Sequence, residues 1–359
     1  MTERLRQSDY MHFAKFGADA RYRLSTSGVA DCALGDLRLT MDDLALHGPN
    51  AGGYAPLTAR VAERFGVDPA CVVMPGGGCS FANHLALGAM LSPGDEVLVE
   101  SPTYELIIST LSYLQARVRS FARNPADGWR LDPQRGAAAI TPATRVVVLT
   151  NLHNPSSALA DPADVRAVAE VAAKVGARVF IDEVYLELTV GDGPARTAFT
   201  ADANVVVTSS LTKAYGLSGL RCGWILASPA LAERMRRLND LFGVHPPHVS
   251  ERMAVVAFDR LPALRARAAA LLDANRAAYR EILGGHPKLD QTIFEAGATV
   301  FPRVLDGDGE ALFRRLVERY ETSLVPGRFF GAPAHVRIGL GADPAMTRAG
   351  LERVVEALG

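Results

Sequence analysis

The sequence predicts an α/β protein with a large doubly wound domain on a mostly parallel sheet and a smaller α+β domain. Short runs rich in β-branched residues recur through the middle of the chain, and most lack apolar/polar alternation. That composition is typical of strands buried on both faces. Helical patterns lie between these runs, which favours right-handed strand–helix–strand units. After about Leu241 the pattern changes to a long helical stretch followed by short strand-like runs.

The elements of the large domain follow in order along the chain. We expect its strands at Cys71–Met74, Glu96–Val99, Arg145–Thr150, Arg178–Ile181, Asn204–Thr208 and Gly223–Ala227, and helices that include Phe81–Met90 and Pro162–Val175. This domain is assigned to residues 41–249.

The smaller domain is assigned to residues 250–359 together with residues 1–40, which are irregular and are expected to pack back against it. Its first helical stretch, Ser250–Ile282, is expected to be interrupted near Pro262 because proline breaks a helix interior. The remaining elements are strands at Thr299–Val304, Ser323–Val325 and Val336–Leu340, and helices at Glu310–Tyr320 and Met346–Leu358.

Composition excludes several classes of function. The 359 residues carry a formal net charge of −1, so no basic excess points to nucleic acid. No apolar run approaches 18 residues, and the first residues show no secretory pattern. Four cysteines without CxxC spacing are expected to be reduced thiols, which indicates a cytoplasmic protein.

Three polar segments each begin where an expected strand ends. They contain Asn154, Asp182 and Lys213, which are 28 and then 31 residues apart. About 30 residues is the length of one strand–helix–strand unit. The three side chains are therefore expected side by side at the carboxyl edge of the sheet, where α/β proteins bind ligands.

This combination indicates a pyridinium cofactor, because desolvating Asp, Asn and Lys together is costly without a partner. An Asp carboxylate at position 182 can keep a ring nitrogen protonated, and Asn154 and Tyr185 can hydrogen-bond a phenolate oxygen. The amine of Lys213 can form a Schiff base and later move protons.

The motifs resemble those of the aspartate aminotransferase superfamily, the fold type I, class I/II aminotransferases that use pyridoxal 5'-phosphate (PLP). The resemblance covers roughly residues 25 to 355. It is carried by Ser210-Leu211-Thr212-Lys213 with Gly219, Arg221 and Gly223, by Asn154-Pro155, and by Asp182 with Tyr185. It implies the PLP-dependent transferase fold, and a homodimer with shared active sites.

The resemblance also implies the roles of further residues. Catalytic roles fall to Lys213, Asp182 and Tyr185. The phosphate would be held by Gly78, Cys79, Ser80, Ser210 and Arg221, at a helix start that suits an anion. Tyr104 would stack on the ring, and the substrate would be bound by Gly28, Asn154 and Arg337, the last clamping the α-carboxylate.

Two positions depart from the family pattern. The asparagine–proline motif usually continues Thr-Gly, but here it continues Ser156-Ser157, so the backbone is open to a different turn. His47 lies near a position where many relatives have a tyrosine that reaches the partner subunit's phosphate. For His47 a partner-facing contact and a plain surface position are equally open.

No metal site is expected. The two histidines of His245-Pro246-Pro247-His248 are spaced closely enough to suggest metal ligands. The prolines between them prevent a pair on one face of a helix, so the segment is expected to be a rigid connection into the long helical stretch. His153 is expected to be a packing or hydrogen-bonding neighbour of Asn154 rather than a general base. A PLP-binding transcriptional regulator is disfavoured, because only 51 residues precede Gly52 and they show no helix-turn-helix pattern.

The predicted reaction is transamination between an α-amino acid and a 2-keto acid. The alternative is a PLP-dependent β- or γ-elimination, replacement or cyclising enzyme of specialised amino-acid metabolism. The start Tyr10–Lys15 and the segment Leu24–Leu37 are similar to capreomycidine-synthase-like enzymes of that kind. The same catalytic core serves both reaction classes, since fold and cofactor do not fix which bond breaks.

Overall fold

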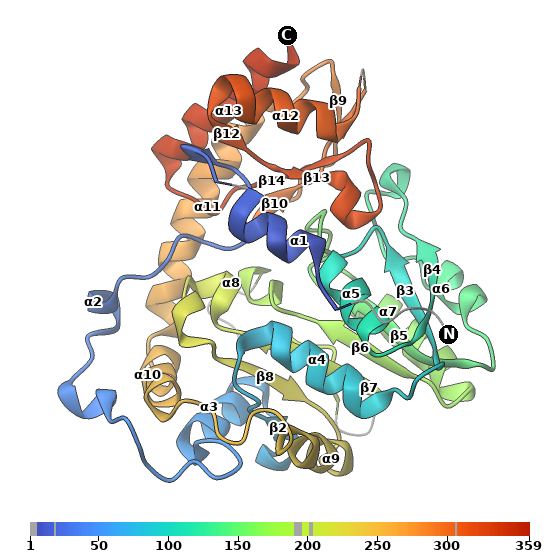
Figure 1. Cartoon of the computed structure of the whole chain (residues 1–359), viewed down its shortest axis with the longest axis vertical. Helices are drawn as coiled ribbons and strands as arrows, with labels where there is room; N and C mark the ends of the chain where they lie inside the picture. The colour runs from blue at the N-terminus through green and yellow to red at the C-terminus, as the bar shows by residue number, and fades with distance from the viewer. Residues whose placement is uncertain (1–5, 18, 190–195, 201–203, 306) are drawn as a thin grey trace.

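The centre of the molecule is a seven-stranded sheet (Figure 1). The computed structural model describes residues 6–17, 19–189, 196–200, 204–305 and 307–359. The strand order is β2-β8-β7-β6-β5-β3-β4; strands β7 to β4 are parallel, and β8 runs antiparallel to both neighbours. The strands are β2 (Val72–Val73), β3 (Glu96–Ser101), β4 (Arg117–Ala122), β5 (Thr144–Thr150), β6 (Arg178–Asp182), β7 (Val205–Ser210) and β8 (Gly223–Leu226).

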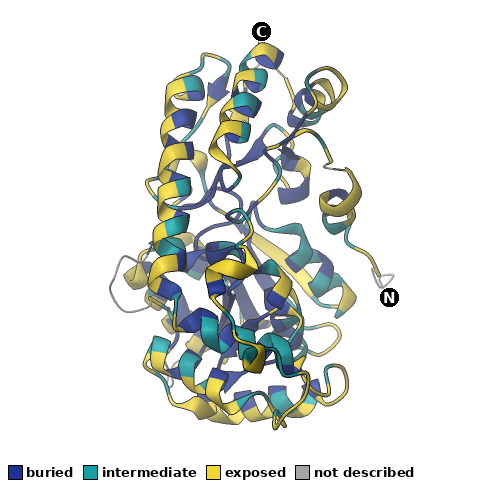
Figure 2. Ribbon diagram, turned by 90° about the vertical axis from the view of Figure 1, so that its left-hand side faces the viewer, coloured by how far each residue is buried: buried dark blue, intermediate teal, exposed yellow. Residues whose placement is uncertain are grey.

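Both faces of this sheet are buried under helices, as the uninterrupted apolar runs predict (Figure 2). On β5, Val147 and Leu149 belong to one apolar cluster, and Val146 and Val148 to another. The first cluster includes residues of α3 (Ala55–Phe65), α7 (Pro162–Lys174), α8 (Thr212–Tyr215) and α10 (His248–Phe258). The second includes residues of α4 (Gly78–Met90), α5 (Glu105–Tyr113) and α9 (Pro229–Asn239).

Every strand expected in the large domain is present, but β4 was not predicted. It lies at the edge of the sheet, and all its residues except Phe121 are exposed. An exposed edge strand lacks the apolar run by which its buried neighbours are recognised.

A second body of structure is built from the C-terminal part of the chain, at the top of Figure 1. Its long helix, α11 (Leu261–Leu283), packs on α13 (Pro344–Leu358), and α13 packs on α12 (Gly309–Tyr320). The strands β10 (Thr299–Val300), β14 (Val336–Gly339) and β13 (Val325–Pro326) form an antiparallel sheet. Two further pairs are β11 (Arg303–Val304) with β9 (Leu289–Asp290), and β12 (Thr322–Ser323) with β1 (Tyr22–Arg23).

The N-terminal segment runs between the two bodies (Figure 1). It contains α1 (Asp9–His12), β1, α2 (Leu34–Leu37) and the 3-10 turn η2 (Met41–Leu44). Its strand β1 pairs with β12, and the carbonyl of Leu24 accepts a hydrogen bond from Gly339 N at 2.7 Å. The other short turns are η1 (Phe13–Gly17), η3 (Pro69–Cys71), η4 (Pro125–Asp127), η5 (Leu186–Thr189), η6 (Ser218–Leu220) and η7 (Gly327–Phe330), and the remaining helix is α6 (Pro133–Ala139).

We propose a division into a large domain, residues 41–249, and a smaller domain formed by residues 1–40 with 250–359. The separate apolar clusters of the sheet and of the C-terminal elements support it. Helix α10 does not fit this division, because most of it falls in the range of the smaller domain while its residues Ala254, Ala257 and Phe258 pack in the apolar cluster of the large sheet. The helical stretch expected from Ser250 is indeed interrupted, at residues 259–260.

The register of the sheet brings the expected polar segments together. Thr150 at the end of β5 pairs with Asp182 at the end of β6, and Asp182 pairs with Thr208 in β7. The segments that carry Asn154 and Lys213 therefore leave the sheet next to Asp182. Among the described residues, no helix is long and apolar enough to cross a membrane.

Candidate active site

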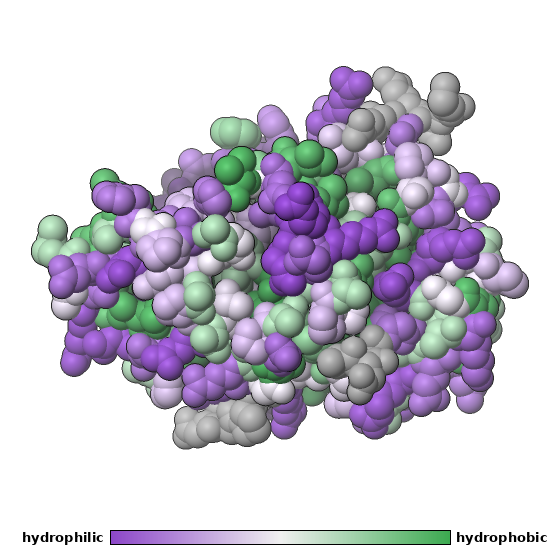
Figure 3. Space-filling view, turned by 90° about the horizontal axis from the view of Figure 1, so that it is seen from below, coloured by the Kyte–Doolittle hydropathy of each residue, from purple (hydrophilic) through white to green (hydrophobic). Residues whose placement is uncertain are grey.

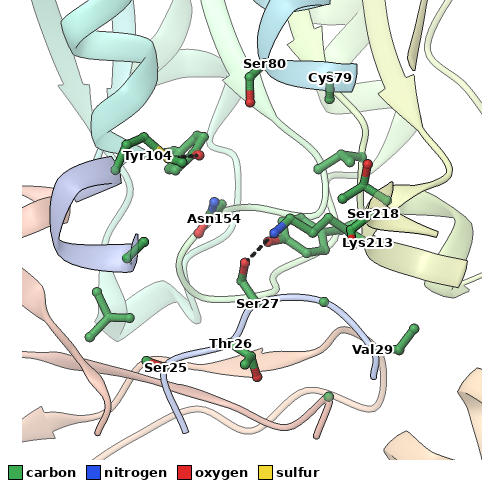
Figure 4. A pocket seen from close by; sticks show the side chains of 18 of the residues that line it. Ser25, Thr26, Ser27, Val29, Cys79, Ser80, Tyr104, Asn154, Lys213 and Ser218 are labelled. Carbon is green, nitrogen blue, oxygen red and sulfur yellow. Dashed lines mark hydrogen bonds between the residues drawn. The ribbon is translucent and has the colours of Figure 1, made fainter. Parts of the chain in front are cut away.

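A cavity of about 750 Å³ lies beside the carboxyl edge of the large sheet. Its wall combines the start of α4 with the ends of β5, β6 and β7 on one side and the segment Ser25–Asp31 on the other (Figure 4). Residues of α1 and η1, and Gly341–Asp343 of the smaller body, also line it. Most residues to which a role was assigned line this cavity: Gly28, Cys79, Ser80, Tyr104, Asn154, Asp182, Tyr185, Ser210, Lys213 and Arg221.

Lys213 projects its amine into the cavity from the first turn after β7 (Figure 4). Its Nζ donates to the hydroxyl of Ser27 at 2.9 Å. Burial, and next the positive charge of Arg337, lower the pKa of this amine to about 8. A neutral amine is the form that acts as nucleophile or base, so the surroundings prepare Lys213 for that chemistry.

Gly28 lies directly against Lys213, in the N-terminal segment. A Cβ atom at this position would stand 3.0 Å from Lys213 Cδ and 3.1 Å from its Cα. The next residue, Val29, donates its N–H to the carbonyl of Lys213 at 3.0 Å. The absence of a side chain at Gly28 thus allows the N-terminal segment to approach the lysine closely.

Asp182 is the last residue of β6 and is held by three donors. Asn83 Nδ2 donates to one carboxylate oxygen at 2.8 Å, and Val184 N donates to the other at 3.0 Å. Cys79 Sγ lies 3.5 Å from that second oxygen. Burial raises the pKa of Asp182, and these hydrogen bonds counteract the rise. The carboxylate is therefore fixed in place and would gain from a cationic partner.

Asn154 and Arg337 come from different bodies of the molecule and meet beside the cavity. Arg337, in β14, is fully buried, and its Nη1 donates to Asn154 Oδ1 at 3.1 Å. Its Nη2 donates to the hydroxyl of Tyr10 at 2.8 Å. Arg337 itself is not among the residues that line the cavity, whereas Asn154 and Tyr10 are.

The start of α4 offers polar groups suited to an anion. Gly78 has a φ of +74°, and a Cβ there would lie 2.7 Å from Arg221 Nη2. Its N–H already donates to Arg221 O at 2.8 Å, and Gly78 does not line the cavity. The N–H groups of Cys79 and Ser80 belong to the first turn, where intrahelical acceptors are lacking.

Hydroxyl groups line the part of the cavity next to the start of α4. Ser80, Ser210 and Thr212 line the cavity together with Arg221. Thr212 Oγ1 is buried, and no described residue forms a hydrogen bond with it. A buried hydroxyl without a partner is costly unless a ligand satisfies it.

Two tyrosines flank the cavity. The ring of Tyr104, which precedes α5, packs edge-on against the ring of Tyr10 with centroids 5.4 Å apart. Tyr185 follows β6 and is buried beside Ser27. Burial raises the pKa of both hydroxyl groups, so both are neutral donors at ordinary pH.

Ser157 adopts a left-handed conformation, with φ of +70°. The position that is usually glycine in the family motif therefore keeps a conformation that glycine favours. The Ser157 hydroxyl donates to the carbonyl of Thr299 at 2.8 Å, and its side chain fills the space beside Gly297.

The histidines singled out in the sequence lie outside the cavity. His47 is exposed on the N-terminal segment, and His248 begins α10 with its ring edge-on to Tyr54. His153 is buried, with its ring nitrogens 2.7 Å from Ser156 Oγ and 2.9 Å from Pro102 O. Within the described ranges, no group of three His, Cys, Asp or Glu residues could hold a metal ion.

Sequence reasoning missed four residues of this arrangement: Tyr10, Ser27, Asn83 and Thr212. Thr212 lies next to Lys213 within the lysine motif and could have been found there. The other three contact Arg337, Lys213 and Asp182 across more than 90 positions of sequence, and no motif marks them.

Comparison with known proteins defines the class to which this fold and site belong. The model of the family "Aminotransferase class I and II" matches residues 34–358, and the chain belongs to that family. Capreomycidine synthase of Streptomyces vinaceus is 31% identical over 95% of this chain and 90% of its own length. Arginine–pyruvate transaminase of Pseudomonas aeruginosa is 31% identical over 83% of this chain and 79% of its own length.

A solved structure of a PLP-dependent cyclase is also similar, with a TM-score of 0.85 and 26% identity over 100% of this chain and 99% of that one. The protein is thus a PLP-dependent enzyme of the class I/II aminotransferase family with the fold type I architecture. Its cofactor is pyridoxal 5'-phosphate, and members of this family act on small-molecule amino-acid substrates. The cavity fits that cofactor, because it presents an amine, a buried carboxylate and an anion cradle to one space.

Proposed function

We propose that the protein is an aminotransferase that moves an amino group between an α-amino acid and a 2-keto acid. The observation that carries the proposal is the amine of Lys213 facing the same cavity as Asp182, with Arg337 held behind Asn154. One wall can hold the cofactor, and Arg337, buried behind Asn154 and Tyr10, supplies a positive charge next to the cavity for a carboxylate.

The cofactor would be held at three points. Cys79, Ser80, Ser210 and Arg221, with Gly78 shaping the turn, would hold the phosphate, and Thr212 is an additional donor. Asp182 would pair with the ring nitrogen, while Asn154 and Tyr185 would contact the ring oxygen. Tyr104 would lie against the ring face. When bound, PLP supplies an aldehyde that condenses with amines and a ring that accepts electrons.

The other residues act on the substrate. Arg337 and Asn154 would orient the α-carboxylate, and Gly28, which packs against Lys213, would lie beside the bound substrate. Lys213, as a free amine, would take the proton from the α-carbon. An aminotransferase must then deliver that proton to a carbon other than the α-carbon, so Nζ has to reach both. The depressed pKa of Lys213 favours both transfers near neutral pH.

A second candidate is a cyclising, eliminating or replacing enzyme on the same cofactor. The similarity to capreomycidine synthase over 95% of the chain and to the structure of a PLP-dependent cyclase favours it. Both candidates require the same removal of the α-proton, so the residues above would serve either reaction.

The test is a set of amino donors added to the purified protein with bound PLP. L-Arginine is the first donor because one relative is an arginine–pyruvate transaminase, and Asp31 and Asp343 line the cavity and would favour a cationic side chain. The proposal predicts loss of the visible absorbance with donor alone, one keto acid per site, and recovery when pyruvate is added. The variant Lys213→Ala should show none of these changes.

The second candidate gives a different result. Its product would accumulate well beyond one per site without any keto acid, and the absorbance would return as the donor is consumed. A purified protein that takes up no PLP would contradict both candidates.

We further propose that the enzyme is a cytoplasmic homodimer. Large apolar side chains are exposed on the N-terminal segment and after α9; they are Leu34, Met41, Leu46, Leu241, Phe242 and Val244. Figure 3 shows the lower face of the molecule, where hydrophobic side chains gather in patches among hydrophilic ones. Exposed apolar patches mark protein contacts. The four unpaired cysteines support a reducing compartment.

A further inference from the structure

We propose that Tyr10 is a substrate-positioning residue whose hydroxyl donates a hydrogen bond to the α-carboxylate held by Arg337. The inference rests on the proposed function and extends it, because it adds a ligand to the carboxylate site from the N-terminal helix α1. Tyr10 lines the cavity together with Asn154, Tyr185 and Lys213, and its ring is buried.

The hydrogen-bond count at Arg337 supports this role. A guanidinium has five N–H groups. Nη1 donates to Asn154 Oδ1, and Nη2 donates to Tyr10 at 2.8 Å and more weakly to Ser25 O at 3.5 Å. Nε is buried and has no hydrogen-bond partner among the described residues. Donors therefore remain for a carboxylate while the contacts to Asn154 and Tyr10 persist.

The hydroxyl of Tyr10 is used as a hydrogen-bond acceptor, while its capacity as a donor is unused among the described residues. Its oxygen accepts from Arg337, so its own proton must point elsewhere. No described residue accepts that proton. A buried phenol proton without an acceptor, next to a buried cation, would be satisfied by an anionic oxygen bound to the same arginine.

Contacts on both sides hold α1 in place. The hydroxyl of Ser8, the N-cap of α1, donates to Glu105 at the start of α5, in the large domain. Beyond the helix, Phe13 packs on Phe313 and Phe329 of the smaller domain, with ring centroids 5.3 Å and 4.8 Å apart. The phenol of Tyr10 is therefore positioned by both domains across the cavity.

Two reagents that condense with bound PLP test the proposal without knowledge of the natural substrate. Aminooxyacetate carries a carboxylate, and O-methylhydroxylamine lacks one. Loss of the visible absorbance gives a rate constant for each. In the wild type, aminooxyacetate should react faster. In Tyr10→Phe its rate should fall about 10-fold, the size expected of a hydrogen bond to a charged group, while the rate of O-methylhydroxylamine stays within about twofold.

The matched control is Tyr320→Phe, which deletes a hydroxyl that donates to Glu356 O on the surface of the smaller domain. It should leave both rates unchanged. Equal rates of the two reagents in the wild type, an unchanged ratio in Tyr10→Phe, or a parallel loss of both rates would overturn the proposal. A rise in the aminooxyacetate rate would also overturn it, because the hydroxyl would then be an obstacle at Arg337. Failure of the protein to bind PLP would instead overturn the proposed function, and this inference with it.

Discussion

At the residue scale, Lys213 combines the properties of a nucleophile and of a base. Its amine is taken from water and lies in the field of Arg337, and both effects disfavour the protonated form. The hydrogen bond to Ser27 orients the amine toward the space shared with Asp182. The pKa of about 8 has a direct consequence for the capture of PLP.

We predict that protein stripped of PLP recaptures the cofactor at a rate that rises with pH and levels off above about 8. Only the neutral amine attacks the aldehyde, and its fraction grows about tenfold per pH unit below the pKa. An ordinary lysine has a pKa of 10.5, so the rate at which it captures PLP would still be rising at the highest pH measured. The measurement is the return of visible absorbance between about pH 7 and 10.

Nα-acetyl-lysine mixed with PLP in the same buffers serves as the control for the titration of PLP itself. A protein profile that follows this free amine would show that the surroundings of Lys213 do not lower its pKa.

Asn83, on α4, connects Asp182 at the end of β6 to Thr208 of the neighbouring strand β7. Its Nδ2 donates to Asp182, and its Oδ1 accepts from Thr208 at 2.6 Å. We predict that Asn83→Ala weakens PLP binding about 10-fold, because one carboxylate oxygen of the buried Asp182 loses its hydrogen bond. Titration of PLP into the stripped protein measures this.

The matched control for Asn83 is Asn124→Ala, which removes an amide that caps η4 and does not line the cavity. Equal affinity for PLP in Asn83→Ala and the wild type would show that Asp182 does not depend on Asn83.

At the element scale, the start of α4 and the start of β8 are packed backbone against backbone. A Cβ on Gly223 would lie 2.5 Å from the carbonyl carbon of Gly78 and 2.8 Å from the nitrogen of Cys79. Gly78 N donates to Arg221 O, so the two elements also share a hydrogen bond. Gly219 belongs to the same lysine motif, but a Cβ there would meet no atom of the described residues within 4 Å.

We predict that Gly223→Ala lowers the melting temperature by several degrees and weakens PLP uptake, because α4 must move away from β8. Gly219→Ala, the same change four residues away, should leave both properties close to those of the wild type. Thermal unfolding with and without PLP measures the difference. Equal behaviour of the two variants would contradict the role given to the contact of β8 with α4.

How far the sequence predicts these elements depends on burial and on distance along the chain. Strands β5, β6 and β7 could be predicted because they are buried on both faces, and the roughly 30-residue spacing places Asn154, Asp182 and Lys213 side by side. Edge strand β4 could not, because its side chains are mostly exposed. Tyr10 could not be assigned to Arg337, 327 positions away, since no local pattern encodes a contact between the first helix and β14.

At the scale of the whole molecule, a single chain leaves large apolar side chains on its N-terminal segment in contact with water. Met41 is 83% exposed and Leu46 is 80% exposed. His47 follows directly and is also exposed. Burying a large apolar side chain contributes about 1.5–3 kcal/mol. The segment therefore has a physical reason to lie against a second copy of the chain, and His47 would then face the partner subunit.

We predict that the wild type is a dimer and that Met41→Asp combined with Leu46→Asp weakens dimerisation by more than about 100-fold, since two buried apolar contacts would be replaced by charges. Sedimentation velocity over a dilution series measures the association. Val317→Asp, on the surface of α12, is the matched control and should leave the dimer intact, because Val317 is 36% exposed and lies in the smaller domain. If the active sites are shared, the double variant should also lose PLP on dilution, whereas the control retains it. A wild type that sediments as a monomer at every concentration would contradict the homodimer, and His47 would then be a plain surface residue.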